Sequence, residues 1–256
     1  MIIAAFNPKG GVGKSTTAVN IASVLARRGK SALLVDLEAD MNASISVGVR
    51  PNHTPSSIAE LLLREANSDD AVRRVQGVSN LHLIAGSPRL ATIDAALRHA
   101  RQPERRLADV LRPLESRFDA IVIDSPAGFS LMAASVPLIA QHLLVPACAQ
   151  YLALESLAQF LRWYHERRSL RQAEANVAGI VMTMVDNRWQ ATREIIDIIR
   201  LHNRRGVCRT EIPRDPRASE APSHGVPLVA WRRSPAADAY DRLTTEVLAR
   251  IRTKAR

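Results

Sequence analysis

We predict an α/β fold in which a doubly wound, mostly parallel sheet is flanked by helices on both faces. Three observations support it. Short apolar runs of β type alternate with helical patterns along the chain. Most of these runs lack apolar–polar alternation, as expected for strands buried on both faces of a parallel sheet. A glycine-rich loop follows the first run and precedes a helical pattern, which is the context of a phosphate-binding loop.

The elements follow one another in strand-then-helix order, which favours right-handed crossovers. The predicted strands are Ile2–Phe6, Ala32–Asp36, Leu81–Ala85, Ala120–Asp124, His142–Val145, Ala178–Met184 and Cys208–Ile212. The predicted helices are Ser15–Arg28, Ser57–Glu65, Pro88–Ala100, Glu104–Arg117, Leu131–Gln141, Leu154–Arg171, Thr192–Asn203 and Ala236–Arg252. Surface loops are expected at Val49–Ser56 and Ala66–Asp70. With no internal repeat and no visible boundary, residues 1–256 are expected to form a single domain.

Bulk composition narrows the class of protein. The formal net charge of +10 favours an anionic partner, either nucleic acid or an anionic membrane surface, over a basic surface with no partner. Two cysteines make neither a disulfide framework nor a zinc pattern, and the chain opens directly into the strand and loop, so we expect a cytoplasmic protein. No run of 18 apolar residues predicts a membrane span.

The first loop carries the clearest chemistry. Lys9-Gly10-Gly11-Val12-Gly13-Lys14-Ser15-Thr16 contains the G-K-[ST] end of a phosphate-binding signature. Glycines let backbone amides turn toward phosphates, and the helix N-terminus adds partial positive charge. Lys14 would reach the β- and γ-phosphates, and the Ser15 hydroxyl would bind Mg²⁺. A plain turn between a core strand and a helix is the weaker alternative.

Lys9 adds a second signal to this loop. Only four of the 35 basic residues are lysines, and two of them lie in this loop. A compact ammonium therefore fits close to packed backbone where a planar guanidinium would not. The K-G-G-x-G-K-[ST] pattern resembles the deviant Walker A loop of the ParA/MinD family of P-loop ATPases. The resemblance implies that Lys9 reaches across a dimer interface to the ATP of the other subunit.

The second strand leads into a departure from the family pattern. ParA-like proteins usually carry D-x-D-P-Q-x-N-[AS] here, and Asp36, Asn42 and Ala43 match it. Glu38 stands where the family has the Asp that positions the attacking water, and Asp40 stands at the Gln position. We expect Glu38 to orient that water, with Asp40 as a candidate to assist it, and we expect slow turnover in the absence of a partner, because near-attack geometry tolerates small displacements poorly.

Phe118–Gly128 looks like a Walker B strand. An apolar run delivers Asp124 to the carboxyl end of its strand, where Mg²⁺ sits beside the phosphate loop. The resemblance implies that Asp36 and Asp124 hold Mg²⁺ through water. It also implies that the residues around Gly128 form a switch loop facing the γ-phosphate.

Ile212–Pro227 closely resembles the I-P-R-N-x-R-x-S-E-A-P-S-x-G-x-P segment of the partition branch of this family. By that resemblance Met184, Pro213 and Asp215 lie near the adenine. Arg188 and Arg217 match DNA-contacting arginines by motif position, and Arg193, Arg232 and Arg233 are weaker candidates for a non-specific DNA surface. Trp189 is interpreted as a packed edge aromatic rather than a base-stacking residue.

The resemblance implies an ATPase that uses ATP and Mg²⁺, forms an ATP-dependent homodimer and binds DNA non-specifically, so that it is nucleoid-associated when ATP-bound. Hydrolysis would be stimulated by a ParB-like partner, and the cargo would be a chromosome, a plasmid or a protein assembly such as a carboxysome or chemosensory cluster. One alternative is a MinD-like membrane-surface ATPase, although the C-terminal helix lacks the bulky apolar face of such anchors. Another is a P-loop enzyme of the same superfamily that carries out synthesis or electron transfer.

Overall fold

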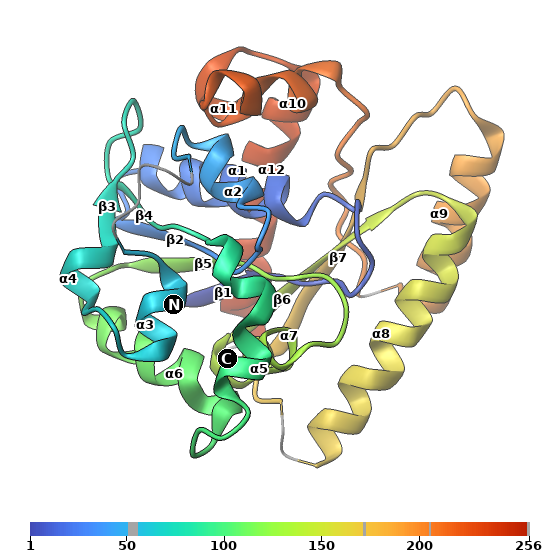
Figure 1. Ribbon diagram of the computed structural model, residues 1–256. Coiled ribbons are helices and arrows are strands. Elements are labelled where there is room, and N and C mark those ends of the chain that lie inside the picture. Colours follow the sequence, from blue (N-terminus) through green and yellow to red (C-terminus); the bar gives the residue numbers. More distant parts are fainter. Residues whose placement is uncertain (51–55, 171–172, 205, 255–256) are drawn as a thin grey trace.

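A computed structural model describes residues 1–50, 56–170, 173–204 and 206–254 (Figure 1). Its strands form a seven-stranded sheet in the order β3-β4-β2-β5-β1-β6-β7. They are β1 (Ile2–Ala5), β2 (Ala32–Asp36), β3 (Val72–Arg74), β4 (Leu81–Ile84), β5 (Ala120–Asp124), β6 (His142–Cys148) and β7 (Asn176–Thr183). Only the β3–β4 pair is antiparallel. The predicted doubly wound, mostly parallel sheet is confirmed.

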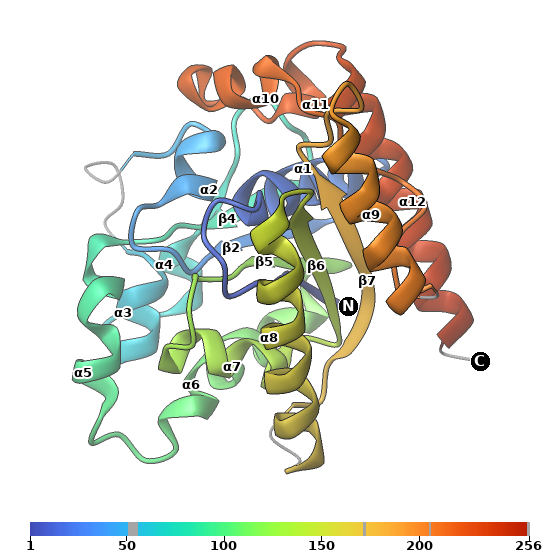
Figure 2. The same ribbon diagram turned by 90° about the vertical axis from the view of Figure 1, so that its right-hand side faces the viewer.

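Helices cover both faces of this sheet, as Figures 1 and 2 show. The helices are α1 (Lys14–Arg27), α2 (Asn42–Ser46), α3 (Ile58–Leu63), α4 (Ser68–Ala71), α5 (Ile93–Leu97), α6 (Arg106–Leu111), α7 (Leu131–Ile139), α8 (Tyr151–Ser169), α9 (Gln190–His202), α10 (Pro216–Glu220), α11 (Leu228–Trp231) and α12 (Pro235–Lys254). Short 3₁₀ turns lie at Pro88–Thr92, Pro103–Arg105, Arg112–Ser116 and Ala221–His224.

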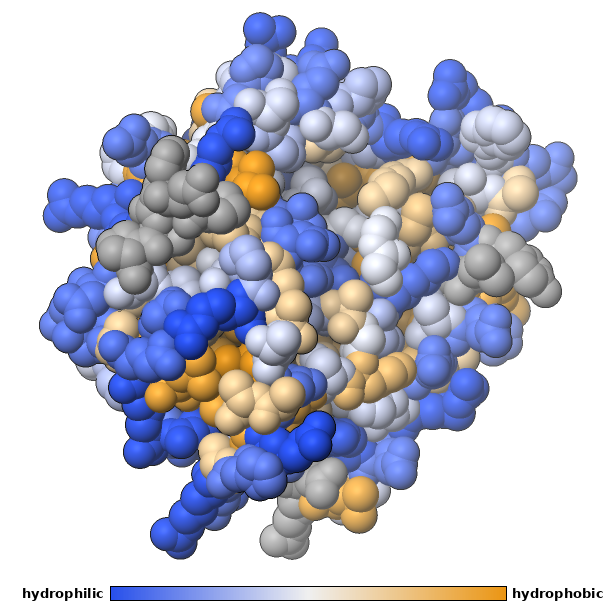
Figure 3. All heavy atoms as spheres, in the orientation of Figure 1, coloured by the Kyte–Doolittle hydropathy of each residue, from blue (hydrophilic) through white to orange (hydrophobic). Residues whose placement is uncertain are grey.

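The central strands are buried on both faces, which explains their continuous apolar sequences. In β1, Ile2 and Ala4 pack into the core under α3, α6, α7 and α8, whereas Ile3 and Ala5 pack into the core under α1 and α12. Successive side chains of a strand point to opposite faces, so a doubly covered strand needs an apolar residue at each position. Polar residues cover most of the face shown in Figure 3.

Two strand predictions are corrected. The edge strand β3 was not expected, because Val72–Arg74 is short and basic, as edge strands often are. The predicted strand Cys208–Ile212 is instead an extended segment that touches β7 and its continuation at two isolated bridges. Its ladder is interrupted because the amides of Arg209 and Thr210 donate to the Glu246 carboxylate, at 2.7 and 2.9 Å.

Prolines and local caps account for the differences among the helices. The predicted helix Glu104–Arg117 ends as α-helix at Leu111, because Pro113 cannot continue it, and the remainder forms 3₁₀ turns. The predicted helix Pro88–Ala100 likewise begins as a 3₁₀ turn. The expected loop Ala66–Asp70 contains the start of α4, capped by the Asn67 side chain. Residues 51–55 of the expected loop Val49–Ser56 lie outside the described residues.

Candidate nucleotide site and basic surface

The loop between β1 and α1 has the geometry of an anion cradle. Gly11 and Gly13 have φ values of 72° and 86°, a left-handed conformation that favours glycine. Gly13 directly precedes α1, and no side chain caps that helix. The amides of the first helical turn are therefore left for a ligand, together with the positive end of the helix dipole.

Hydrogen bonds with two strands, β6 and β7, fix this loop. The Asn7 side chain donates to the Pro146 carbonyl in β6 at 2.7 Å and accepts from the Lys9 amide at 2.9 Å. The Thr183 hydroxyl at the end of β7 donates to the Val12 carbonyl at 2.8 Å. The loop is thus ordered by the sheet itself, as preorganised phosphate binding requires.

The two loop lysines differ in their surroundings. Lys14 is only 5% exposed; its ammonium lies 3.4 Å from the Lys9 carbonyl and 3.7 Å from the Glu38 carboxylate. The Lys9 side chain is half-buried, and within the described part of the chain its ammonium forms no ion pair. Lys14 is therefore held inside the cradle, whereas the Lys9 ammonium is left for an external anion. The remaining predicted loop residues Gly10, Ser15 and Thr16 are at least partly exposed around it.

Asp36 organises the segment that carries Glu38. Its fully buried carboxylate accepts from the Glu38 amide at 3.0 Å and from the Ser44 amide and hydroxyl at 2.8 and 2.7 Å. The Gly86 amide donates to the same Ser44 hydroxyl at 3.0 Å. Burial raises the pKa of Asp36 to about 6, although the bonds from Ser44 and Glu38 lower it in part.

Asp124 differs from Asp36 because its carboxylate is unsatisfied. It is fully buried at the end of β5, and neither oxygen has a hydrogen-bond partner among the residues that the structure describes. Burial and the nearby Asp36 raise its pKa well above the usual range, and the Ser15 hydroxyl opposes this. Two orphaned carboxylate oxygens facing a serine hydroxyl fit a hydrated Mg²⁺ ion. Of the predicted metal residues, Ser15 and Asp124 suit this role directly, whereas Asp36 is already hydrogen-bonded within the protein.

No separate cluster of three His, Cys, Asp or Glu side chains suits a metal among the described residues.

Glu38 lies between the phosphate loop and the switch loop after β5. Burial raises its pKa, and Lys14 and the Ala127 backbone amide lower it in part. Asp40, the other acidic residue in this segment, is exposed. Of the two, Glu38 is therefore the carboxylate that lies beside Lys14 of the phosphate loop, and its catalytic role stays a prediction.

The switch loop, residues 125–130, is anchored at both ends. The Gly128 amide donates to the Pro8 carbonyl at 2.8 Å. The Phe129 ring lies 5.4 Å from that of Trp163 in α8, and Trp163 stacks on Phe6 at 5.4 Å. We call Phe6, Phe129, Phe160 and Trp163 the aromatic cluster; it ties the switch loop to the end of β1 and to α8.

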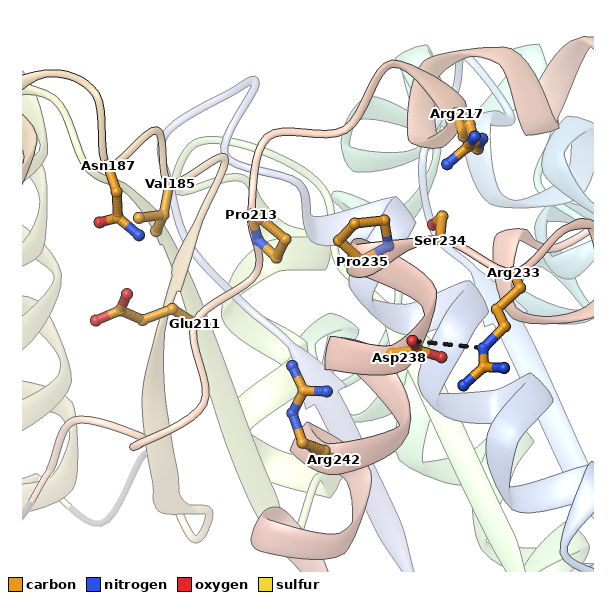
Figure 4. A pocket seen from close by; sticks show the side chains of 10 residues that line it. All are labelled: Val185, Asn187, Glu211, Pro213, Arg217, Arg233, Ser234, Pro235, Asp238 and Arg242. Atoms are coloured by element: carbon orange, nitrogen blue, oxygen red, sulfur yellow. Dashed lines mark ion pairs between the residues drawn. The ribbon is translucent and has the colours of Figure 1, made fainter.

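The three predicted adenine residues lie at the end of β7. A Cβ added at Gly13 would be 3.8 Å from the Met184 Cε, so Met184 borders the phosphate loop. Val185 forms a parallel bridge with Pro213, and both residues line a hollow of about 550 Å³ (Figure 4). Asp215 is engaged elsewhere: its carboxylate accepts from the amides of Arg217 and Ala236, at 3.0 and 3.3 Å. Adenine contacts of all three residues stay a prediction.

Two of the predicted DNA arginines, Arg217 and Arg233, line the same hollow. They line it together with Arg242, opposite the turn that carries Asn187 (Figure 4). Arg188 follows Asn187; its side chain is 85% exposed and forms a bidentate pair with Asp186, at 2.9 and 2.7 Å. Arg232 packs over Trp231 next to Arg233, and the exposed Arg193 lies one turn along α9. Two of the five predicted DNA arginines therefore line this hollow, and DNA contacts of all five stay a prediction.

Several residues of this site were not predicted. Ser44 and Gly86 hold Asp36, and Thr183 holds the phosphate loop, yet each acts through a partner far away in the sequence. A glycine directly after a strand is a weak signal of close backbone approach, which Gly86 fits. The interpretation of Trp189 as a packed aromatic is wrong, since its side chain is 65% exposed.

Comparison with known proteins agrees with this geometry. A family model described as an AAA domain matches residues 1–174. The chain is 36% identical to the chromosome-partitioning ATPase Soj of Thermus thermophilus, covering 97% of this chain and 96% of that protein. This chain belongs to the ParA/Soj family of partitioning ATPases. It is also 33% identical to the sporulation initiation inhibitor protein Soj of Bacillus subtilis, over 97% of this chain and 98% of that protein.

Solved structures give the same fold. Cobyrinic acid a,c-diamide synthase from Mycobacterium smegmatis, with a bound ATP analog and magnesium, superposes with a TM-score of 0.85 at 25% identity, over 99% of this chain and 96% of that one. The cell division ATPase MinD of Pyrococcus furiosus superposes with a TM-score of 0.79 at 27% identity, over 97% of this chain and 98% of that one. No helix in the described ranges of this ParA/Soj family member is long and apolar enough to cross a membrane.

Proposed function

We propose that this ParA/Soj-type chain hydrolyses ATP with Mg²⁺ and couples it to non-specific DNA binding by a homodimer. Lys14 and the amides of the loop bind the phosphates, and Ser15 and Asp124 hold Mg²⁺. The ion, when bound, neutralises charge that develops on the transferred phosphoryl group. Glu38 orients the attacking water, and Lys9 binds the nucleotide of the partner subunit.

The observation that carries this proposal is that the end of β7 contacts the phosphate loop and leads directly into the turn that carries Arg188. Thr183 bonds the Val12 carbonyl, and Met184 borders Gly13. Four residues after Met184 comes Arg188, on the surface lined by Arg217. A conformational change in the phosphate loop would therefore reach the turn that carries Arg188 through residues in direct contact. This contact provides a route by which ATP could control DNA binding.

ATP-dependent DNA binding is the first test. We expect a fluorescent random-sequence duplex to bind the full chain with ATP and to dissociate with ADP, and Lys14→Ala to abolish binding in both. Lys9→Ala should keep nucleotide affinity but lose dimerisation, measured by light scattering. If wild-type protein binds DNA equally with ATP and ADP, the coupling is wrong; if it binds DNA in neither state, the DNA function is wrong.

Steady-state ATPase assays test the role of Glu38. We expect Glu38→Ala to lose at least tenfold in kcat, and Asp40→Ala, the matched exposed carboxylate, to keep wild-type turnover. Glu38→Asp shortens the side chain by one methylene toward the residue usual in ParA-like proteins and should retain activity. Unchanged turnover in Glu38→Ala would remove this residue from the mechanism.

Regulation and cargo complete the proposal. A ParB-like partner bound to the cargo would stimulate hydrolysis and so release the dimer from DNA, with the ATP-bound form on the nucleoid. We expect the addition of such a partner with DNA to raise kcat, which a coupled ATPase assay measures. A MinD-like membrane role would instead give ATP-dependent sedimentation with anionic liposomes and none with DNA.

A further inference from the structure

Trp189 is the exposed tryptophan of this chain. Its side chain is 65% exposed, whereas Trp163 packs in the aromatic cluster and Trp231 is covered by His224, at 4.7 Å, and by the Arg232 guanidinium, at 4.8 Å. Single exposed apolar side chains are common on protein surfaces, so exposure alone assigns no ligand. Trp189 differs from the still more exposed Leu201 in the charged residues that surround it.

The turn that carries Trp189 is ordered. Its amide donates to the Asp186 carbonyl at 3.2 Å, and its carbonyl accepts from Thr192 at 3.1 Å, so the residue marks the start of α9. The indole also helps to keep the pKa of Asp186 low, at about 2, after the larger effect of Arg188. A tryptophan side chain has two rotatable bonds, so it loses little conformational entropy when it binds a ligand.

The charges around this ring select its partner. Arg188 precedes it directly, Arg193 lies on the next turn of α9, and Arg217 faces the same turn across the hollow. The neighbouring acid Asp186 is already paired with Arg188, at 2.7 Å. An exposed aromatic among arginines matches a polyanion that also offers apolar surface, which is the chemistry of nucleic acid.

We propose that Trp189 packs against the sugars and bases of the DNA whose phosphates Arg188 contacts. This inference rests on the proposed DNA binding and adds to it a contact that does not depend on charge. Aromatic contacts with bases tolerate any sequence, because all bases present an apolar face. Loss of the ring should weaken binding about tenfold, within the range of measured aromatic substitutions.

Salt dependence distinguishes this contact from an ionic one. A phosphate contact releases counterions, so Arg188→Ala should reduce the slope of log K against log salt by about 1. Trp189→Ala releases none and should leave that slope unchanged while lowering affinity at all salt concentrations. A purely structural effect of the substitution would disturb the Arg188 pair and change the slope as well.

The experiment is fluorescence anisotropy with the full chain, ATP and a labelled random-sequence duplex from 50 to 300 mM salt, about the range in which phosphate contacts are resolved. Trp189→Phe keeps an aromatic ring and should bind within about threefold of wild type. Leu201→Ala is the matched control, because Leu201 is 79% exposed at the far end of α9. Equal affinity of Trp189→Ala and wild type, or equal losses in Trp189→Ala and Leu201→Ala, would overturn the inference.

Tryptophan emission gives an independent readout. In a Trp163→Phe/Trp231→Phe variant Trp189 is the single indole, and we expect duplex DNA to quench it with ATP but not with ADP. Vesicles of phosphatidylglycerol form the second arm: a blue shift with vesicles and no response to DNA would assign the ring to a membrane surface and refute the proposal. If wild-type protein fails to bind DNA, the proposed function falls; if only Trp189→Ala is without effect, this inference falls alone.

Discussion

The buried Asp36 should make the protein more stable at mildly acidic pH. Its pKa is raised from 3.8 to about 6, so the folded chain binds a proton more tightly than the unfolded chain. The resulting stabilisation is fully present below pH 3.8 and is lost as the pH rises through 6. The shift of about two pKa units corresponds to about 3 kcal/mol in total. Between pH 7.5 and 5.0, linkage gives about 1.4 kcal/mol of it.

Urea unfolding without nucleotide or Mg²⁺, followed by circular dichroism at both pH values, measures this effect. Asp36→Asn removes the titrating group, and any hydrogen bond that it loses weakens the fold equally at both pH values. Asp36 itself should therefore make wild-type protein gain about 1.4 kcal/mol more than Asp36→Asn between pH 7.5 and 5.0. Asp36 also raises the pKa of the neighbouring Asp124, so its removal reduces the gain of the variant further. Burial lowers the pKa of His82, so acidification over the same range destabilises the fold at this residue. This effect is the same in wild type and in Asp36→Asn.

The exposed Asp109 supplies the control. Asp109→Asn makes the same substitution at an exposed position, so it controls for the chemical change alone. If wild type and Asp36→Asn gain equally on acidification, the carboxylate does not titrate where its burial places it. The picture of a charge held in the core without a cation would then be wrong.

Three further predictions concern the loops. A Cβ at Gly86 would lie 2.6 Å from the Glu38 carbonyl, so Gly86→Ala should cost about 1–3 kcal/mol in urea unfolding and lower kcat; unaltered kinetics would argue against a fixed Glu38 segment. Phe129→Ala frees the switch loop from the aromatic cluster and should lower kcat in steady-state assays without changing KM, whereas a change in KM alone would contradict this role. Asp186→Asn releases Arg188 from its exposed ion pair and should tighten DNA binding up to about fivefold by anisotropy; weaker binding would show that the pair positions the arginine.

The sheet and the phosphate loop were predictable because their signals are local. Buried central strands such as β2 and β5 read as continuous apolar runs, and the loop carries its glycines and lysines in ten consecutive residues. The edge strand β3 has no such run. The segment Cys208–Ile212 has an apolar pattern, but two of its amides donate hydrogen bonds to Glu246, a residue more than thirty positions away. Such competition between distant partners leaves no trace in the local pattern.

The interior of the site was harder to predict for the same reason. The sequence indicated Asp36 and Asp124 as equivalent metal residues. In the described structure, however, Ser44 donates a hydrogen bond to Asp36, whereas the Asp124 oxygens have no hydrogen-bond partner. That difference depends on which side chains the fold brings within 3 Å, and Ser44 differs little from any other serine in the sequence. The exposure of Trp189 likewise depends on how α9 meets the edge strand β7.

The central position of β1 has a consequence for biosynthesis. Its hydrogen-bonding partners are β5 and β6, so Ile3 pairs with Val122 and His142. The strand that leads into the phosphate loop is synthesised before both of its partners and has no neighbour until the chain has grown by more than a hundred residues, which takes roughly 6–25 s at ordinary rates of translation. During that interval its apolar run depends on chaperones or on non-native contacts, and slow codons before β5 should raise aggregation more than slow codons after β7.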